Sequence, residues 1–291
     1  MIVVKLIGGL GNQLFQYAAA RRLAYTHNVP LKLDISGFHI YKLHSYSLHH
    51  FNIIEDFVDV SDIADFVPVK NMAVKIANRL MQMGTPYYRQ NVIKERYFHF
   101  DPNILLAGRH VCLEGYWQSE KYFKDIEDII RNEFTIKDRS DALNTQIACE
   151  ISARDSVAMH IRRGDYTSDA NTNKVHGVSS MLYYRQAIQL VSSRINKLHL
   201  YIFTDDPAWA KQEIRFDCPT TLLTHNNADK NYEDLRLMSL CKHNILANST
   251  FSWWGAWLNR NPAKIVIAPK KWFNDKSRNT DDLIPDGWLR L

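Results

Sequence analysis

Apolar runs and amphipathic stretches alternate along the chain. Short apolar runs, which are typical of buried strands, occupy residues 2–7, 31–34, 111–117, 157–161, 198–203, 220–223, 244–247 and 264–269. Apolar residues recur at helical spacing over residues 14–24, 71–83, 119–134, 140–152, 182–194, 231–241 and 251–257. Residues 167–178 and 270–291 are polar and predict a loop and a tail. Strands that alternate with helices predict parallel sheets, so the expected fold class is α/β and doubly wound.

Two domains of ordinary size fit into 291 residues. The polar run at residues 137–141 is the best candidate for a junction, and ligand-type loops follow strands on both sides of it. We therefore expect an N-terminal domain over residues 1–150 and a C-terminal domain over residues 151–291. An alternative for the extreme C-terminus is that it packs back on the first domain.

Composition and charge narrow the class of partner. A hydrophobic content of 46% and a charged content of 23% are ordinary for a globular protein. The formal net charge of +5 suits a phosphorylated small molecule or an anionic surface, but it is too weak to argue for nucleic acid. The four cysteines are far apart and form no Cys-x-x-Cys pair, which indicates neither a zinc site nor a disulfide framework. The chain begins with a strand pattern rather than a signal peptide, and no apolar run is long enough for a membrane span, so we expect a cytoplasmic location.

Two arginines, a glycine and an aspartate directly follow the apolar run at residues 157–161. They are Arg162, Arg163, Gly164 and Asp165. In an open α/β sheet, ligands lie where strands end and loops begin. The planar fork of arginine bonds two phosphate oxygens at once and stays charged. Adjacent side chains point to different sides, so we expect at most one arginine to face a ligand, while the other pairs with Asp165 or with water. The alternative is a strand end with solvated charges.

A glycine-rich stretch, GGLGNQ at residues 8–13, separates the first strand from the first helix. This arrangement presents backbone N–H groups and the positive end of a helix to an anion. Asn12 and Gln13 add side-chain donors at the helix start. A tight turn without a ligand is the alternative.

The same stretch partly fits a dinucleotide-binding fingerprint. Gly9 and Gly11 match its first two glycines, but Leu14 stands at the third position. Asp34, at the end of the strand over residues 31–34, is placed to mimic the acid that binds a ribose. The partial match keeps an NAD-dependent oxidoreductase among the alternatives.

The strand over residues 198–203 ends in Thr204-Asp205-Asp206-Pro207. Asp206 before a proline is typical of a helix start, with an acid at the N-cap and proline at the first helical position. That leaves Asp205 at the carboxyl end of the strand, where an unpaired carboxylate can accept hydrogen bonds from the N1–H and N2–H₂ groups of guanine. A second capping or solvated acid is the alternative.

A further ligand-type loop follows the strand at residues 244–247. The sequence there reads NSTFSWWGAW over residues 248–257, in which Asn248, Ser249 and Thr250 supply caps and hydroxyl donors at a helix start. Together with the N–H groups of the helix they predict a second anion cradle. The three tryptophans are interpreted as core between helix and sheet.

Four stretches together resemble the bacterial α-1,2-fucosyltransferases of glycosyltransferase family 11. They are GGLGNQLFQYA at residues 8–18, HIRRGD at 160–165, FTDD at 203–206 and NSTFSWWGA at 248–256. The stretches span nearly the whole chain. The resemblance implies a GT-B fold, in which two Rossmann-like domains face each other across a cleft. It also implies GDP-fucose as the donor, no metal or other cofactor, and inversion at the anomeric carbon.

The resemblance further implies roles for individual residues. The donor-binding residues of the second half are His160, Arg162, Asp165, Asp205, Ser249 and Thr250. Of these, Arg162 matches the arginine that contacts the β-phosphate, Ser249 and Thr250 hold the diphosphate, and Asp205 lies near guanine, with Asp206 as the weaker candidate. In the first half, the residues that face donor and acceptor are Gly9, Gly11 and Asn12.

The implied reaction is a single displacement on fucose. Negative charge develops on the leaving β-phosphate, and Arg162 can stabilise it electrostatically without a divalent metal. A general base is expected near the acceptor hydroxyl, and Asp34 is the candidate. Asn12 completes the expected catalytic set.

The expected function is the inverting, metal-independent transfer of L-fucose from GDP-fucose to the 2-hydroxyl of a terminal β-galactoside in a surface glycan or oligosaccharide. The alternatives are an α-1,6 or α-1,3 linkage, the NAD-dependent oxidoreductase, and a non-catalytic nucleotide-sugar binding module. The expected partners are GDP-fucose and a galactose-containing glycan, with no nucleic acid. Peripheral contact with the inner membrane surface, where lipid-linked acceptors are made, is a further option.

Overall fold

The computed structural model describes residues 1–40, 43–59, 62, 66 and 84–291. It divides into two compact units: the first comprises residues 1–135 with 281–283, and the second residues 136–280 with 284–291. The division falls between residues 135 and 136, so the boundary expected at residue 150 would run through helix α5 (Ala142–Ser152), which belongs to the second unit.

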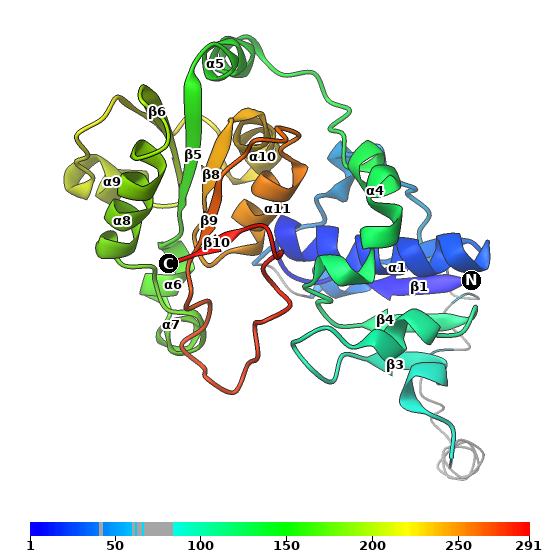
Figure 1. The fold of residues 1–291 in the computed structure, drawn as a ribbon. Coiled ribbons are helices and arrows are strands. Elements are labelled where there is room, and N and C mark those ends of the chain that lie inside the picture. Colours follow the sequence, from blue (N-terminus) through cyan, green and yellow to red (C-terminus); the bar gives the residue numbers. More distant parts are fainter. Residues whose placement is uncertain (41–42, 60–61, 63–65, 67–83) are drawn as a thin grey trace. The chain divides into compact units, whose positions relative to one another are not determined.

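The first unit contains a parallel sheet with the strand order β2-β1-β4-β3 (Figure 1). Its strands are β1 (Ile2–Lys5), β2 (Leu31–Asp34), β3 (Val92–Lys94) and β4 (Val111–Glu114). β1 pairs with β2 on one side and with β4 on the other, and every pairing is parallel. The central position of β1 explains its apolar composition, because both of its faces are covered.

Helix α1 (Leu10–His27) begins four residues earlier than the sequence pattern predicts. Gly9 is its N-cap, and the N–H groups of Asn12 and Gln13 both bond to the Gly9 carbonyl oxygen. The buried Gln13 side chain donates to the carbonyl oxygen of Gly8, which secures the first turn where polar sequence had indicated a loop. Asn12 therefore lies in the first turn of a helix, at the carboxyl end of β1.

The remaining helices in the described part of the first unit are short. They are η1 (Ser36–His39), η2 (Leu48–His50), η3 (Tyr87–Arg89), η4 (Pro102–Leu106), η5 (Glu120–Tyr122), η6 (Lys124–Ile126) and α4 (Glu127–Glu133). The single helix predicted over residues 119–134 is wrong, because the fully buried Phe123 adopts a non-helical φ of −143° between η5 and η6. The helix predicted over residues 71–83 lies outside the described residues.

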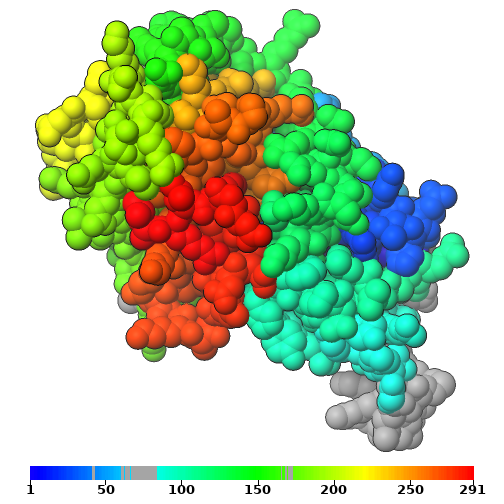
Figure 2. Space-filling model, viewed as in Figure 1, coloured from blue at the N-terminus to red at the C-terminus, as the bar shows by residue number. Residues whose placement is uncertain are grey.

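The second unit contains a parallel sheet with the strand order β10-β9-β8-β5-β6-β7. Its strands are β5 (Asp155–Ile161), β6 (Leu198–Thr204), β7 (Thr220–Leu223), β8 (His243–Ile245), β9 (Val266–Ala268) and β10 (Leu289–Arg290). The expected polar tail thus ends in an edge strand, which pairs with β9. Figure 2 shows these last residues, in red, as part of the surface of the second unit.

Helices alternate with these strands as the sequence predicts. They are α5, α6 (Gly164–Ser168), α7 (Ala170–His176), α8 (Met181–Ser192), α9 (Pro207–Glu213), η7 (Ala228–Lys230), α10 (Asn231–Leu240) and α11 (Thr250–Leu258). The loop predicted over residues 167–178 is largely helical instead. Its polar residues bond to the backbone, as where the Asn173 side chain donates to the carbonyl oxygen of Tyr166.

The strand order creates a switch point in each sheet. From β5 the chain adds β6 and β7 on one side, and then β8, β9 and β10 on the other. In such a sheet, ligands lie outside the carboxyl ends of the two strands at which the order reverses, here β5 and β8. The same rule selects β1 and β4 in the first sheet. Three of the four sequence motifs follow one of these strands.

Candidate functional site

Arg162 follows the end of β5 and is held by an acid and an aromatic ring. Its Nη1 lies 2.8 Å from Oδ2 of Asp205, at the end of β6. Its Cζ lies 5.3 Å from the centroid of the Tyr166 ring in α6. The second oxygen of Asp205 accepts the backbone N–H of Arg163 at 2.8 Å. The expectation of an unpaired Asp205 is therefore wrong, because the parallel pairing of β5 and β6 brings the two strand ends together.

Gly164 makes room for this carboxylate. A Cβ atom at residue 164 would lie 2.4 Å from Oδ2 of Asp205, which is closer than side-chain carbons approach other atoms. The glycine thus permits the close approach of an acid from the same unit. Asp165 lies in α6, and its side chain falls outside the described residues.

Arg163 points to a different set of partners, as expected for adjacent residues. Its Cζ lies 3.9 Å from the centroid of the Trp209 ring, and its Nε lies 3.6 Å from Oδ2 of Asp206. Arg163 is therefore paired with Asp206, and the predicted partner Asp165 has its side chain outside the described residues. Asp206 also caps α9, because its Oδ1 accepts the N–H of Trp209 at 3.1 Å, and Pro207 occupies the first helical position. This confirms the predicted helix start.

His160 lies on the face of β5 opposite to the apolar cluster of Val157, Met159 and Ile161. Its ring is buried, 5.6 Å from the centroid of the Phe251 ring in α11. Its Nδ1 has no hydrogen-bond partner among the described residues. Burial lowers the pKa of His160 to about 4; the charge of Asp205 opposes this shift and that of Arg162 reinforces it. The imidazole is therefore neutral at physiological pH, with one donor and one acceptor nitrogen.

Ser249 and Thr250 begin α11 directly after β8. The Ser249 side chain accepts the N–H of Phe251 at 3.3 Å and so acts as the N-cap that the sequence predicts. The preceding Asn248 is structural, because its buried amide donates to three backbone carbonyl groups. The hydroxyl of Tyr166 donates to the Asn248 carbonyl oxygen at 3.4 Å, which ties the loop after β5 to the loop after β8.

In the first unit, the predicted residues lie at the carboxyl ends of β1 and β2. Gly8 has a φ of +77°, and a Cβ on it would lie 2.6 Å from Nδ2 of Asn12. A Cβ on Gly9 would lie 3.4 Å from the His44 ring. Gly11 is buried in the first turn of α1.

Asp34 ends β2 in register with Lys5 at the end of β1. Its Oδ1 accepts the N–H of Ser36 at 2.9 Å, so one carboxylate oxygen is engaged in a local turn. Asp34 and the glycine-rich stretch thus share one edge of the first sheet, which is the edge where a ligand is expected.

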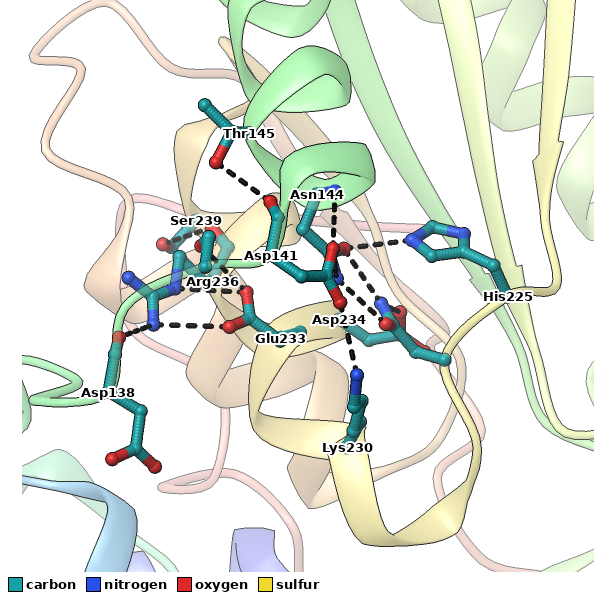
Figure 3. A network of polar contacts seen from close by, with 12 residues as sticks. Asp138, Asp141, Asn144, Thr145, His225, Lys230, Glu233, Asp234, Arg236 and Ser239 are labelled. Carbon is teal, nitrogen blue, oxygen red and sulfur yellow. Dashed lines mark hydrogen bonds and ion pairs between the residues drawn. The ribbon is translucent and has the colours of Figure 1, made fainter.

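A network of polar side chains fastens α5 to the segment around α10 (Figure 3). Asn144 exchanges amide hydrogen bonds with Asn226, and Asn226 donates to Asp234 at 2.8 Å. Asp141 caps α5 and pairs with Lys230 at 3.1 Å. Burial raises the pKa of Asp234 to about 7; the hydrogen bond from Asn226 opposes this shift and the nearby Glu233 reinforces it. None of these residues was singled out from the sequence.

Among the described residues, no group of three or more histidine, cysteine, aspartate or glutamate side chains is arranged to hold a metal ion. In the same part of the chain, no helix has both the length and the apolar character needed to span a bilayer.

Comparison with known proteins identifies the family. The model of glycosyl transferase family 11 matches residues 1–291, the whole chain. The chain belongs to this family. It is 34% identical, over 296 aligned positions that cover 100% of the chain and 99% of the relative, to an alpha-1,2-colitosyltransferase of Escherichia coli. It is 25% identical to galactoside alpha-(1,2)-fucosyltransferase 2 of Sus scrofa, covering 89% of the chain and 69% of the relative.

A solved structure shares the fold. The chain matches the fucosyltransferase NodZ from Bradyrhizobium with a TM-score of 0.50 and 10% identity, over 87% of this chain and 92% of that one. The two Rossmann-like units, each with a parallel sheet, are those of a GT-B glycosyltransferase, as the family resemblance implied. The family 11 chain is therefore an enzyme that transfers a glycosyl group.

Several residues that contact the predicted site residues of each unit were missed in the sequence. Tyr166 and Trp209 flank the two arginines, and Gln118 donates to Asn12 at 2.9 Å. Trp209 is the third residue after the Asp206 cap, the position whose backbone N–H an N-cap side chain accepts. Its proximity to Asp206 could therefore have been predicted from the sequence. The contacts of Tyr166 and Gln118 could not be predicted in this way, because the sequence pattern places both residues in irregular segments.

Proposed function

We propose that this family 11 enzyme transfers L-fucose from GDP-fucose to the 2-hydroxyl of a terminal β-galactoside in a surface glycan or oligosaccharide, with inversion. The observation that carries the proposal is the fixed guanidinium of Arg162 at the switch point of the second sheet, beside the loop that begins α11. The activities after which the relatives are named support both the sugar class and the linkage.

The second unit is assigned to the donor. Arg162 takes the β-phosphate, and Ser249 and Thr250 take the diphosphate at the start of α11, where backbone N–H groups and the helix dipole favour an anion. Asp165 and the neutral imidazole of His160 complete the nucleotide contacts. Asp205 already forms an ion pair with Arg162 and accepts the backbone N–H of Arg163, so its primary role in this proposal is to hold Arg162.

The chemical step is a single displacement. The oxygen of the galactoside 2-hydroxyl forms a bond to the anomeric carbon of fucose while the bond from that carbon to the phosphate oxygen breaks. GDP leaves with the electron pair, and the hydroxyl proton passes to a base. Charge that develops on the leaving phosphate is stabilised by Arg162 and the helix end, which are fixed before the reaction.

The first unit is assigned to the acceptor side. Gly9, Gly11 and Asn12 at the start of α1 face donor and acceptor, and Asp34 is the proposed base. One oxygen of Asp34 is held by Ser36, which leaves its other oxygen as the proton acceptor in this proposal.

The proposed reaction needs no divalent metal, because cationic and dipolar groups of the chain supply the positive charge. We place it in the cytoplasm, at the inner membrane face where lipid-linked acceptors are made. The four free cysteines support a reducing compartment.

Colitose is a second candidate sugar. The observation that favours it is the relative named alpha-1,2-colitosyltransferase, which is 34% identical over its full length. Colitose is fucose without the 3-hydroxyl, so the GDP derivatives of both sugars present the same β-phosphate to Arg162.

The test is incubation of the purified protein with GDP-fucose and a panel of β-galactosides, followed by linkage analysis of any product. We expect an α-1,2-fucosylated galactoside. GDP-colitose in competition decides between the two sugars. An α-1,6 or α-1,3 linkage would overturn the linkage, and tight binding of GDP-fucose without transfer to any galactoside would show a non-catalytic binding module.

A further inference from the structure

The switch point of the first sheet has a second strand, β4, whose following turn plays no part in the function proposed above. We call residues 115–118 the β4 turn; they are Gly115, Tyr116, Trp117 and Gln118. Because β4 lies beside β1 in the sheet, the β4 turn and the first turn of α1 share one edge.

Gln118 joins the two segments. Its Nε2 donates to Oδ1 of Asn12 at 2.9 Å, and the side chain is 7% exposed. With its oxygen held by Gln118, the Asn12 amide directs its nitrogen toward Gly8, where a Cβ would lie only 2.6 Å away. The orientation of the Asn12 amide is thus set from two sides.

The backbone of the β4 turn is in an unusual conformation. Trp117 has a φ of +56°, which is rare for a bulky residue, and its side chain is buried. Such a conformation persists only where the surroundings dictate it, and it is frequent at functional sites.

Glu95, directly after β3, dictates this conformation. Its two carboxylate oxygens accept the backbone N–H groups of Tyr116 at 2.8 Å and Trp117 at 2.9 Å. Gly115 allows the approach, since a Cβ there would lie 2.4 Å from Cβ of Glu95. One acid therefore braces the turn that presents Gln118.

We propose that Gln118 is a positioning residue, which acts on the reaction by orienting the Asn12 amide, and that Glu95 braces it. The inference rests on the proposed function, because the contact of Asn12 with the reacting sugars belongs to that proposal. In this proposal the β4 turn does more than pack against its neighbours. Through Gln118 it fixes the direction of the two N–H donors of the Asn12 amide at the ligand-binding edge of the sheet.

The test is a double-mutant cycle on kcat/KM for fucosyl transfer. Gln118→Leu keeps a similar volume but removes the N–H donor, and we expect it to lower kcat/KM by about tenfold. Gln118→Glu is a second, nearly isosteric variant, which places an acceptor against the Asn12 oxygen and should lower it at least as much. In the Asn12→Ala background, Gln118→Leu should add almost nothing, because its effect runs through Asn12.

Tyr122→Phe is the matched control. The buried Tyr122 accepts the N–H of Asp101 at 2.9 Å and packs against Trp117, so the substitution removes a hydrogen bond near the β4 turn and leaves the Gln118 and Asn12 side chains in place. We expect this variant to melt at a lower temperature with kcat/KM unchanged. Additive effects of Asn12→Ala and Gln118→Leu would show a merely structural role for Gln118 and overturn the inference.

A readout without catalysis separates the two proposals. The two side-chain N–H signals of Asn12 in an NMR spectrum should differ from those of a solvent-exposed asparagine in the parent, and both should move toward the solvent-exposed positions in Gln118→Leu. Unchanged signals would overturn the positioning role. If the signals shift as expected but Asn12→Ala transfers fucose at the parental rate, the assignment of Asn12 in the proposed function fails instead.

Discussion

The two switch points of this enzyme are built on the same plan from different chemistry. In each unit a ligand loop follows the first strand of its sheet and leads into a helix, and a second loop follows the neighbouring strand. In the first unit the side chains that meet are the neutral amides of Asn12 and Gln118. In the second, the charged Arg162 at the end of β5 is held by Asp205, which follows β6, the neighbour of β5 on the side away from β8.

Under the proposed function, this difference matches the two halves of a glycosyl transfer. A leaving diphosphate gains charge in the transition state, so a fixed cation stabilises it more than it stabilises the ground state. Sugar hydroxyl groups stay neutral, and a fixed amide can recognise them without the cost of burying a charge. The fold provides the place, and the side chains decide which reactant is stabilised there.

We call the switch point of the second sheet, with Arg162, the charged switch point. The sharpest test of its proposed role in stabilising the leaving phosphate is Arg162→Lys. Lysine keeps the charge but loses the fork that holds both Asp205 and a phosphate, so we expect kcat to fall by a factor of roughly 10²–10³. Steady-state rates with GDP-fucose measure it. Arg163→Lys is the matched control, because Arg163 is occupied by Trp209 and Asp206, and it should retain most activity. Equal losses in both variants would contradict the assignment of Arg162 to the phosphate.

Asp205→Asn decides between two roles for that acid. If Asp205 holds Arg162, losing one charge-assisted partner should cost about 1.5–3 kcal/mol, a factor of about 10 to 100, in GDP affinity. Binding of GMP, which lacks the β-phosphate, should then change little. Calorimetric titration with GDP, GMP and UDP measures it. If Asp205 reads guanine instead, GMP binding should weaken as much as GDP binding, and the preference for GDP over UDP should shrink.

The sequence predicted the strand–helix alternation and most strands because buried parallel strands are continuous apolar runs, as in residues 157–161. Local rules also predicted caps such as Asp206 and Ser249, whose partners lie within three residues. Contacts across the sheet were beyond such rules. The pairing of Arg162 with Asp205 depends on strand register, and the edge strand β10 is two residues long in a polar tail. Trp117 at positive φ carries no sequence signal, since glycine is the residue usually expected there.

Protonation of His160 should couple stability to pH. Burial lowers its pKa from 6.5 to about 4 in the folded state, so the unfolded state binds more protons between these values. The stabilisation is complete above about pH 6.5 and is lost as the pH falls through about 4, with a slope that approaches ~1.4 kcal/mol per pH unit. Urea denaturation at several pH values measures it. His160→Gln should flatten this slope, whereas His199→Gln, at a less buried histidine, should flatten it less. An unchanged slope in His160→Gln would show that other groups dominate.

The smallest expected effect is that of removing divalent metal. In the charged switch point, positive charge comes from Arg162, whose guanidinium is fixed by Asp205, and from the N-terminus of α11. These groups need no loading, so the initial rate of fucosyl transfer in excess EDTA should equal the rate without chelator, and Mn²⁺ or Mg²⁺ should not raise it more than salt of equal ionic strength does. The Arg162→Lys variant sharpens the comparison, because added Mg²⁺ should not restore its lost activity. Abolition by EDTA with rescue by either ion would mean that a metal cation, rather than Arg162, stabilises the charge that develops on the phosphate. The switch point of the second sheet would then have to include a metal ion.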